Sequence, residues 1–293
     1  MLNDEGEMWR FTDGQARFLI LWYAYDEHGR FIYRRGVKRG AKGLGKDWIT
    51  AAMCCMELLA PSQLWWDGEK WTGKRHELPL VQIASNSETQ SKKLLRVANA
   101  MLGADAVEYY RLDKGQTATF VKGTGARMEV LTASERSAEG DPATFSVLNE
   151  THHFTEASGG HRLAAVARRN VGKSKRALQA RMVEFTNAHT QGANSVGEQS
   201  FEAWQKQQSG KYKGLNKDIL YDSIEADPRL DFYDVLLGRL IQMRHGWILS
   251  VLALKSLTRL YRLLRRFVFI LTGSLIRKMR MCQRKRLLLL LIR

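Results

Sequence analysis

Short apolar runs alternate along this chain with stretches whose apolar residues recur every three or four positions. The runs predict buried β-strands, and the second spacing predicts amphipathic helices. The expected helices cover residues 15–25, 48–60, 87–102, 160–170 and 198–208. The expected strands cover residues 31–39, 80–84, 107–110, 117–121, 127–132, 144–148, 181–185 and 219–224. Strands that alternate with helices indicate an α/β fold with a mostly parallel central sheet and helices on both faces.

Two segments follow neither pattern. Residues 62–78 contain three tryptophans together with Gly68 and Gly73, and we expect an irregular connection that packs against the body. Residues 134–142 are polar and contain a glycine, which predicts a loop.

A glycine-rich stretch separates the first expected strand from the second expected helix. It reads G-x-x-x-x-G-K, followed by Asp47 where Ser or Thr is usual. A strand, a glycine-rich turn and a helix form a phosphate-binding loop, because backbone N–H groups and the helix N-terminus face the anion. Lys46 would reach the β- and γ-phosphates, whereas the alternative is an ordinary glycine-rich turn. The predicted nucleotide-binding residues are Gly40, Lys42, Gly43, Leu44, Gly45, Lys46 and Asp47.

A carboxylate for catalysis is expected at the carboxyl end of a neighbouring strand, where such sheets bind ligands. Asn149 and Glu150 follow the apolar run 144–148, and Glu150 predicts the group that activates the attacking water. Asn149 stands where an Asp that orders the Mg²⁺ shell is usual, and it supplies only a carbonyl oxygen. We hypothesise that Asp47 restores the missing charge, so that Asp47 and Asn149 serve Mg²⁺. The alternative is a pocket that binds nucleotide without hydrolysing it.

Three further sites each have two interpretations. Thr186 and Asn187 end another expected strand, where they could sense the γ-phosphate or simply start a turn. Gln15 could pair with the edge of an adenine or be a solvated helix residue. His152 and His153 could ligate a metal, but adjacent histidines after a strand are more often surface or capping residues.

The net charge of +16 is distributed unevenly. Residues 235–293 contain 14 Lys and Arg and no Asp or Glu, which leaves 32 basic and 30 acidic residues before them. The net charge therefore does not indicate that the folded body binds nucleic acid. We expect one domain over residues 1–232 and a Leu/Arg-rich basic tail over residues 233–293. The tail is an aberrant, frameshifted extension, a basic amphipathic helix on a membrane or on DNA, or an ordinary helical subdomain.

The cysteines and the N-terminus bear on the compartment. None of Cys54, Cys55 and Cys282 has C-x-x-C spacing, which argues against a disulfide framework and a zinc site and fits a reducing cytoplasm. The first ten residues are polar and acidic, so no secretory signal is expected. The apolar runs of the tail are interrupted too soon by basic residues for a transmembrane segment.

Several of these elements occur in an order that resembles one known family. They are Gln15 in the first helix, the K-x-x-G-K loop Lys42–Lys46, the loop with Ser137, Glu139 and Gly140, the sequence Asn149–His152, and Thr186–Ala188. Over roughly residues 9–230, this set resembles the N-terminal DNA-packaging ATPase domain of the large terminase subunit of tailed bacteriophages.

The resemblance implies a P-loop NTPase fold of the additional-strand type that binds ATP and Mg²⁺. It implies that Lys46 binds the phosphates, that Glu150 activates water, and that Thr186 and Asn187 couple hydrolysis to DNA movement. Asn149 departs from the family's usual Asp. The implied partners are double-stranded DNA, a small terminase subunit, a portal protein and further copies in a homo-oligomeric ring. The implied location is the host cytoplasm.

Large terminases also carry a C-terminal nuclease of the RNase H type, which needs clustered carboxylates around metal ions. Because residues 235–293 contain no acid, we expect no nuclease activity from this chain. Two other functions stay open: a helicase-like nucleic-acid ATPase, whose D-E-x-H motif is similar to Asn149–His152, and a non-catalytic nucleotide- or DNA-binding remnant.

Overall fold

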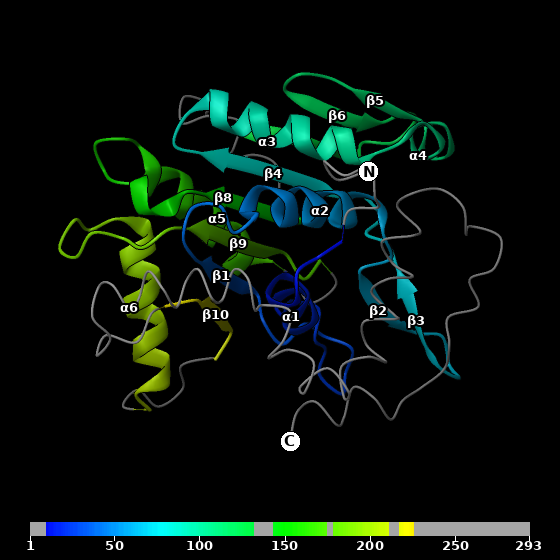
Figure 1. The fold of residues 1–293 in the computed structure, drawn as a ribbon. Helices are drawn as coiled ribbons and strands as arrows, with labels where there is room; N and C mark the ends of the chain where they lie inside the picture. The colour runs from blue at the N-terminus through cyan, green and yellow to red at the C-terminus, as the bar shows by residue number, and fades with distance from the viewer. Residues whose placement is uncertain (1–9, 132–142, 175–177, 211–216, 226–293) are drawn as a thin grey trace.

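A computed structural model describes residues 10–131, 143–174, 178–210 and 217–225. Its centre is an eight-stranded sheet with helices on both faces (Figure 1). The first six strands across the sheet are parallel, and the last two are antiparallel to their neighbours. The predicted α/β fold is therefore confirmed. In spatial order the strands are β10 (Ile219–Ser223), β1 (Arg35–Arg39), β9 (Arg181–Thr186), β8 (Phe145–Asn149), β4 (Leu80–Ser85), β7 (Arg127–Leu131), β6 (Ala118–Val121) and β5 (Leu112–Lys114).

Strand β9 lies between β1, which precedes the glycine-rich loop, and β8, which precedes Glu150. Arg39 at the end of β1 pairs with Thr186 of β9, and Asn149 at the end of β8 pairs with Phe185. An extra strand in this position defines the additional-strand type of P-loop fold, so that prediction is confirmed. Because the three strands are parallel, the residues that follow them meet at one edge of the sheet.

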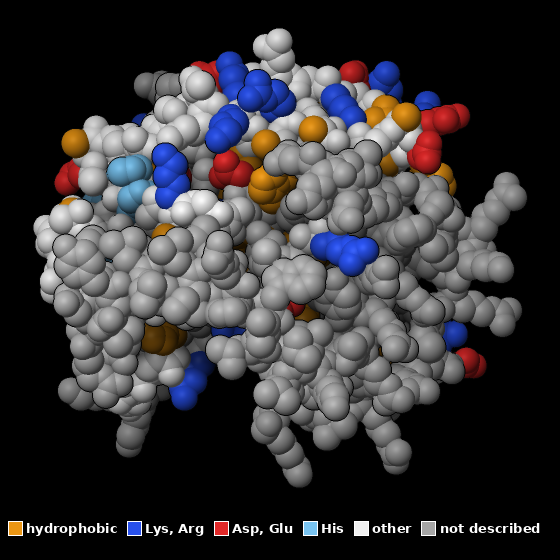
Figure 2. Space-filling model, in the orientation of Figure 1, with side chains coloured by type: hydrophobic (Ala, Val, Ile, Leu, Met, Phe, Trp, Pro, Cys, Tyr) orange, Lys and Arg blue, Asp and Glu red, His pale blue; other side chains and the backbone are white. Residues whose placement is uncertain are grey.

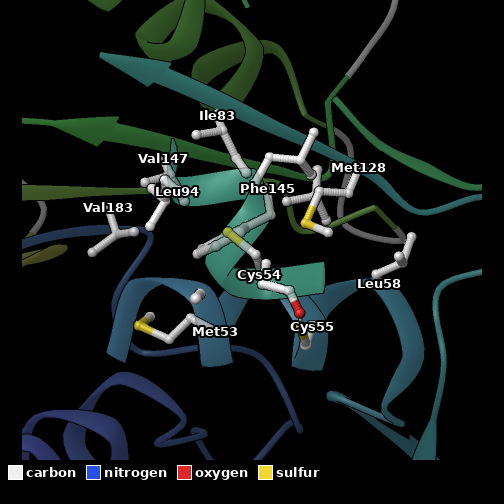
Figure 3. Close-up of a cluster of buried hydrophobic side chains, with 14 of the residues drawn as sticks. Met53, Cys54, Cys55, Leu58, Ile83, Leu94, Met128, Phe145, Val147 and Val183 are labelled. Atoms are coloured by element: carbon white, nitrogen blue, oxygen red, sulfur yellow. Dashed lines mark hydrogen bonds between the residues drawn. The ribbon is translucent and has the colours of Figure 1, made fainter. Parts of the chain in front are cut away.

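Two apolar layers hold the helices on the sheet. On one face, α2 (Lys46–Leu59), α3 (Glu88–Met101) and α1 (Asp13–Trp22) contribute to a single buried cluster with the strands. On the other face, α5 (Gly160–Lys173) and the start of α6 (Val196–Gln208) form a second cluster. Successive strand residues point to opposite faces, so Val183 of β9 joins the first layer and Met182 the second. Figure 3 shows part of the first layer: Met53, Cys54, Cys55, Leu58, Ile83, Leu94, Met128, Phe145, Val147 and Val183.

The expected strand at residues 107–110 is wrong, because these residues belong to the helix α4 (Ala104–Tyr110). Gly103 is its N-cap, and Arg111 ends it in a left-handed conformation with φ 55°. Val107 and Tyr110 have good β-propensity, but local capping and tertiary packing outweigh so weak a preference. Strand β5, which follows at once, was not expected.

The expected irregular connection at residues 62–78 is also wrong in part. It contains a two-stranded hairpin, formed by β2 (Gln63–Trp66) and β3 (Trp71–Lys74). Gly68 in the turn has φ 107°, a conformation that favours glycine. Each strand has only four residues, QLWW and WTGK, and neither shows the alternation of apolar and polar residues by which a half-buried strand is predicted.

Some expectations concern residues outside the described ranges. These are the polar loop at 134–142, with Ser137, Glu139 and Gly140, and the tail at 233–293. Within the described ranges, none of the helices combines the length and the apolar character needed to cross a bilayer.

Candidate active site

The glycine-rich loop joins β1 to α2 in a conformation that only glycine adopts without strain. Gly43 has φ 91° and Gly45, the N-cap of α2, has φ 67°. No side chain caps α2, so its first N–H groups are not satisfied by a capping residue. These N–H groups and the positive end of the helix dipole form an anion-binding site.

Lys46, the first residue of α2, is held over this loop by three acceptors. Its Nζ donates to the carbonyl oxygens of Gly40 and Ala41, each at 2.9 Å, and to Asn187 Oδ1 at 2.7 Å. Burial lowers the pKa of Lys46, whereas the carboxylates of Asp47 and Glu150 act in the opposite direction. The ammonium group of Lys46 therefore bonds to the loop and to Asn187, which follows β9, and it lies within the electrostatic reach of the Glu150 carboxylate.

Gln15 supports the loop from α1. Its Nε2 donates to the carbonyl oxygens of Leu44, at 3.3 Å, and Gly45, at 3.1 Å. Its Oε1 accepts from the Thr12 N–H at 3.0 Å and completes a capping box for α1. Gln15 is only 5% exposed, so the interpretation as a solvated helix residue is wrong. Lys42 and Leu44, in contrast, are exposed.

Glu150 follows β8 with a left-handed backbone, φ 63° and ψ 45°. Such a conformation is uncommon for a residue other than glycine and is frequent at functional sites. The N–H of Glu150 donates to the Phe185 carbonyl at 2.6 Å, which fixes the turn to β9. Its Oε2 accepts from Gln90 Nε2 of α3 at 2.8 Å. Gln90 therefore orients the carboxylate that the sequence predicts to activate water.

The two predicted magnesium residues lie on different elements. Asn149 ends β8 and is 6% exposed, and it pairs in register with Ser85 at the end of β4. Asp47 lies in the first turn of α2, where its carboxylate is 3.2 Å from Lys93 Nζ of α3. Among the described residues there is no group of three or more His, Cys, Asp or Glu placed to hold a metal ion.

Thr186 and Asn187 connect Lys46 to the turn that follows Glu150, the 3-10 helix η2 (Thr151–His153). Thr186 Oγ1 accepts from the His152 N–H at 3.1 Å and lies 3.2 Å from His152 Nδ1. The Asn187 amide lies 3.3 Å from His152 Nε2 and binds Lys46 through its oxygen. Burial, together with the positive charges of His153 and Lys46, lowers the pKa of His152 to about 4. His152 is therefore a neutral hydrogen-bonding residue of the site.

The surface above these residues is chemically mixed. Histidine, basic and acidic side chains lie beside one another at the left of Figure 2, the side to which β4 points in Figure 1. This is the carboxyl-end side of the parallel strands, where such folds bind ligands.

The chain has relatives among phage proteins and a similar fold among solved structures. The chain matches no protein-family profile. It is 34% identical over 222 residues to the Gene 13 protein of Mycobacterium phage D29, which covers 73% of this chain and 36% of that protein. It is 34% identical over 233 residues to the Gene 13 protein of Mycobacterium phage L5, covering 77% and 38% respectively. The chain thus spans little more than a third of the length of these curated relatives.

Among solved structures, the chain is similar to the crystal structure of the HK97 bacteriophage large terminase. The TM-score is 0.59 over 78% of this chain and 42% of that chain, with 13% sequence identity. The chain has a terminase-like fold. At this identity the likeness concerns the fold, and the roles of individual residues rest on the contacts described above.

The sequence pattern did not predict the roles of two residues of the site, Gln90 and His152. Gln90 lies in the first turn of α3, directly beyond the carboxyl end of β4, and that position was the available signal. His152 was weighed as a metal ligand or a capping residue, but it contacts both Thr186 and Asn187. Nothing in its local sequence specifies those partners.

Proposed function

We propose that this domain hydrolyses ATP with Mg²⁺ and acts as the ATPase motor of a phage large terminase, which moves double-stranded DNA into a procapsid. The observation that carries the proposal is the arrangement of Lys46 and Glu150. They come from different elements of a terminase-like fold, and Asn187 and His152 connect the loop of one to the turn of the other.

Phosphate binding would use the loop that the structure already presents. The backbone N–H groups after Gly43 and the dipole of α2 would hold the phosphate oxygens. Lys46 Nζ would exchange its carbonyl partners, Gly40 and Ala41, for phosphate oxygens. Gln15 keeps the loop in this conformation through the carbonyls of Leu44 and Gly45.

Water activation would fall to Glu150, which Gln90 holds by one oxygen at 2.8 Å. The other carboxylate oxygen would accept the hydrogen bond from the attacking water. A change in the contacts of Lys46 on phosphate binding or release would reach η2 directly through Asn187 and His152. Thr186 and Asn187 would in this way report the state of the nucleotide, which is the coupling role implied by the resemblance.

The donor set also fits Mg²⁺, which prefers oxygen ligands and keeps several waters alongside one or two carboxylates and the substrate phosphates. Asp47 is the carboxylate beside Lys46, and Asn149 offers an amide oxygen at the same edge. When bound with ATP, the ion would neutralise charge on the phosphates. Lys93 partly neutralises Asp47, so the compensation between Asp47 and Asn149 stays a hypothesis.

The proposed partners are double-stranded DNA, a small terminase subunit, a portal protein and further copies of the chain in a ring. Their support is the terminase-like fold together with relatives from phages. The same reasoning proposes that the protein works in the host cytoplasm.

The test is ATP turnover by the full chain with and without linear duplex DNA. We expect turnover that duplex DNA stimulates and that falls by at least about 100-fold in Lys46→Ala and Glu150→Gln, because each removes one part of the reaction. Glu129→Gln, on β7 away from the site, is the matched control and should retain activity. Stimulation only by single-stranded DNA would favour a helicase-like ATPase. ATP binding without any turnover would contradict hydrolysis and favour a nucleotide-binding remnant.

A further inference from the structure

A carboxylate is buried in the middle of the sheet, and the reaction described above does not use it. Glu184 of β9 is 2% exposed. It precedes Thr186 by two positions, so both side chains point to the same face of the sheet. That face carries α5 and the start of α6. A buried acid is costly unless it is hydrogen-bonded or paired, so the neighbours of Glu184 decide what it can do.

The partners of Glu184 come from both helices on that face. Its Oε1 accepts from Ser200 Oγ of α6 at 2.6 Å. Arg168 of α5 donates to the same Ser200 oxygen at 3.3 Å. Burial raises the pKa of Glu184, whereas Arg168, Ser200 and Thr151 act in the opposite direction. The carboxyl group thus joins a polar cluster that spans β9, α5 and α6.

The third neighbour is Thr151, the first residue of η2 and the residue directly after Glu150. Its hydroxyl oxygen is buried and has no hydrogen-bond partner within the described residues, and the same is true of Glu184 Oε2. The two groups are near enough for Thr151 to lower the pKa of Glu184. The two groups are complementary, because a hydroxyl donates and a carboxylate oxygen accepts.

Helix α6 closes the other side of this turn. A Cβ on Gly197 would lie 3.3 Å from Thr151 Oγ1 and 3.2 Å from the backbone nitrogen of His152, so the backbone of α6 packs directly on η2. The Val196 N–H also donates to the Phe154 carbonyl at 2.9 Å. The turn is therefore confined between β9 and the N-terminus of α6, with Glu184 at their junction.

We propose that Glu184 is a positioning residue, which through Thr151 and Ser200 holds η2 between β9 and α6 and so sets the left-handed backbone of Glu150. The consequence for hydrolysis rests on the proposed function, whereas the anchoring of the turn does not. A purely packing role of the cluster would hold α5 and α6 on the sheet without affecting the turn.

Glu184→Met tests the anchor because it keeps the side-chain volume and removes both acceptor oxygens. Its control is Glu129→Met, another glutamate of the same sheet, whose carboxylate accepts from Gln82 at 3.0 Å. The readout is amide hydrogen exchange of residues 149–155 in the full chain. This segment includes the N–H groups of His152, His153 and Phe154, which are bonded within or next to η2. We expect exchange about tenfold or more faster in Glu184→Met and unchanged in Glu129→Met.

Kinetics give the second readout. Glu184→Met should lower kcat about tenfold or more and leave KM for ATP within about twofold, since the phosphate loop keeps its contacts. Glu184→Gln should restore kcat to within about threefold, because its oxygen still accepts from Ser200 and its NH₂ group can donate to Thr151. Thr151→Val should slow the reaction as well, and its combination with Glu184→Met should add less than the two separate effects.

Unchanged exchange of residues 149–155 in Glu184→Met, or the same change in Glu129→Met, would overturn the proposal. Equal losses of kcat in Glu184→Gln and Glu184→Met would overturn it too. If the wild-type chain turns over no ATP, the proposed function fails, but the exchange experiment still decides whether Glu184 anchors the turn.

Discussion

The strongest single destabilisation that we predict lies at the opposite end of β9 from the active site. Arg181, the first residue of the strand, is 1% exposed and forms an ion pair with Glu57 of α2, which is equally buried. Its Nη1 donates to the Trp22 carbonyl at 2.9 Å. The guanidinium carbon lies 3.4 Å from the centre of the Phe31 ring. This pair fixes the start of the strand that ends in Thr186.

Arg181→Met should lower the free energy of unfolding by about 3–5 kcal/mol. Removing one partner leaves the Glu57 carboxylate buried without its counter-charge, which costs about that much. The Trp22 carbonyl also loses its donor. The Tyr23 hydroxyl still donates to Glu57 at 2.9 Å, which limits the loss. For a domain of this size, about 2–4 °C of Tm per kcal/mol gives a fall of roughly 6–20 °C.

Thermal unfolding of the full chain by circular dichroism and urea unfolding by tryptophan fluorescence measure this change. Arg30→Met is the matched control, because Arg30 pairs with Asp26 at the surface at 3.1 Å and should cost only about 0–1 kcal/mol. The double variant Arg181→Met/Glu57→Leu should recover at least half of the loss, since no buried charge remains. A loss no larger than that of Arg30→Met, or a double variant no more stable than Arg181→Met, would refute the reasoning.

Three further predictions concern the site. The pKa of His152 is about 4 in the folded chain and 6.5 when the residue is exposed in the unfolded chain. As the pH falls, the unfolded chain therefore takes up this proton at a higher pH than the folded chain does. The free energy of unfolding should therefore fall between about pH 6.5 and pH 4, and less steeply in His152→Gln; equal slopes in urea titrations would contradict this. Asp47→Asn should shift the Mg²⁺ titration of ATP turnover to higher concentration, and an unchanged titration would refute a role for Asp47 in holding the ion. Gln15→Ala should raise KM for ATP several-fold, whereas Thr12→Val, which loosens only the capping box by about 1 kcal/mol, should not; equal KM values would exclude a role of Gln15 in the loop.

Much of the fold could be predicted from local sequence. The helices α2, α3, α5 and α6 and most strands of the sheet follow from periodicity, because the spacing of apolar residues reflects which face of an element is buried. The phosphate loop could be located because Gly43 and Gly45 adopt backbone conformations that few other residues tolerate. The failures were short elements. In α4 and the hairpin of β2 and β3, a few residues carry too little periodic signal to outweigh propensity.

The chemistry of the chain was fixed by its sequence, but the contacts within the site were decided by the tertiary structure. Lys46 and Asn187 are 141 positions apart, and Gln90 and Glu150 are 60 apart. They meet because β9 is inserted between β1 and β8 and because β4 lies on the other side of β8. The apolar faces of the strands can be buried in more than one strand order, so the periodic pattern predicts strands without specifying their neighbours. Glu184 shows the same limit. The sequence shows only a polar residue within an apolar strand, whereas the packing of α6 on η2 brings its partners to it.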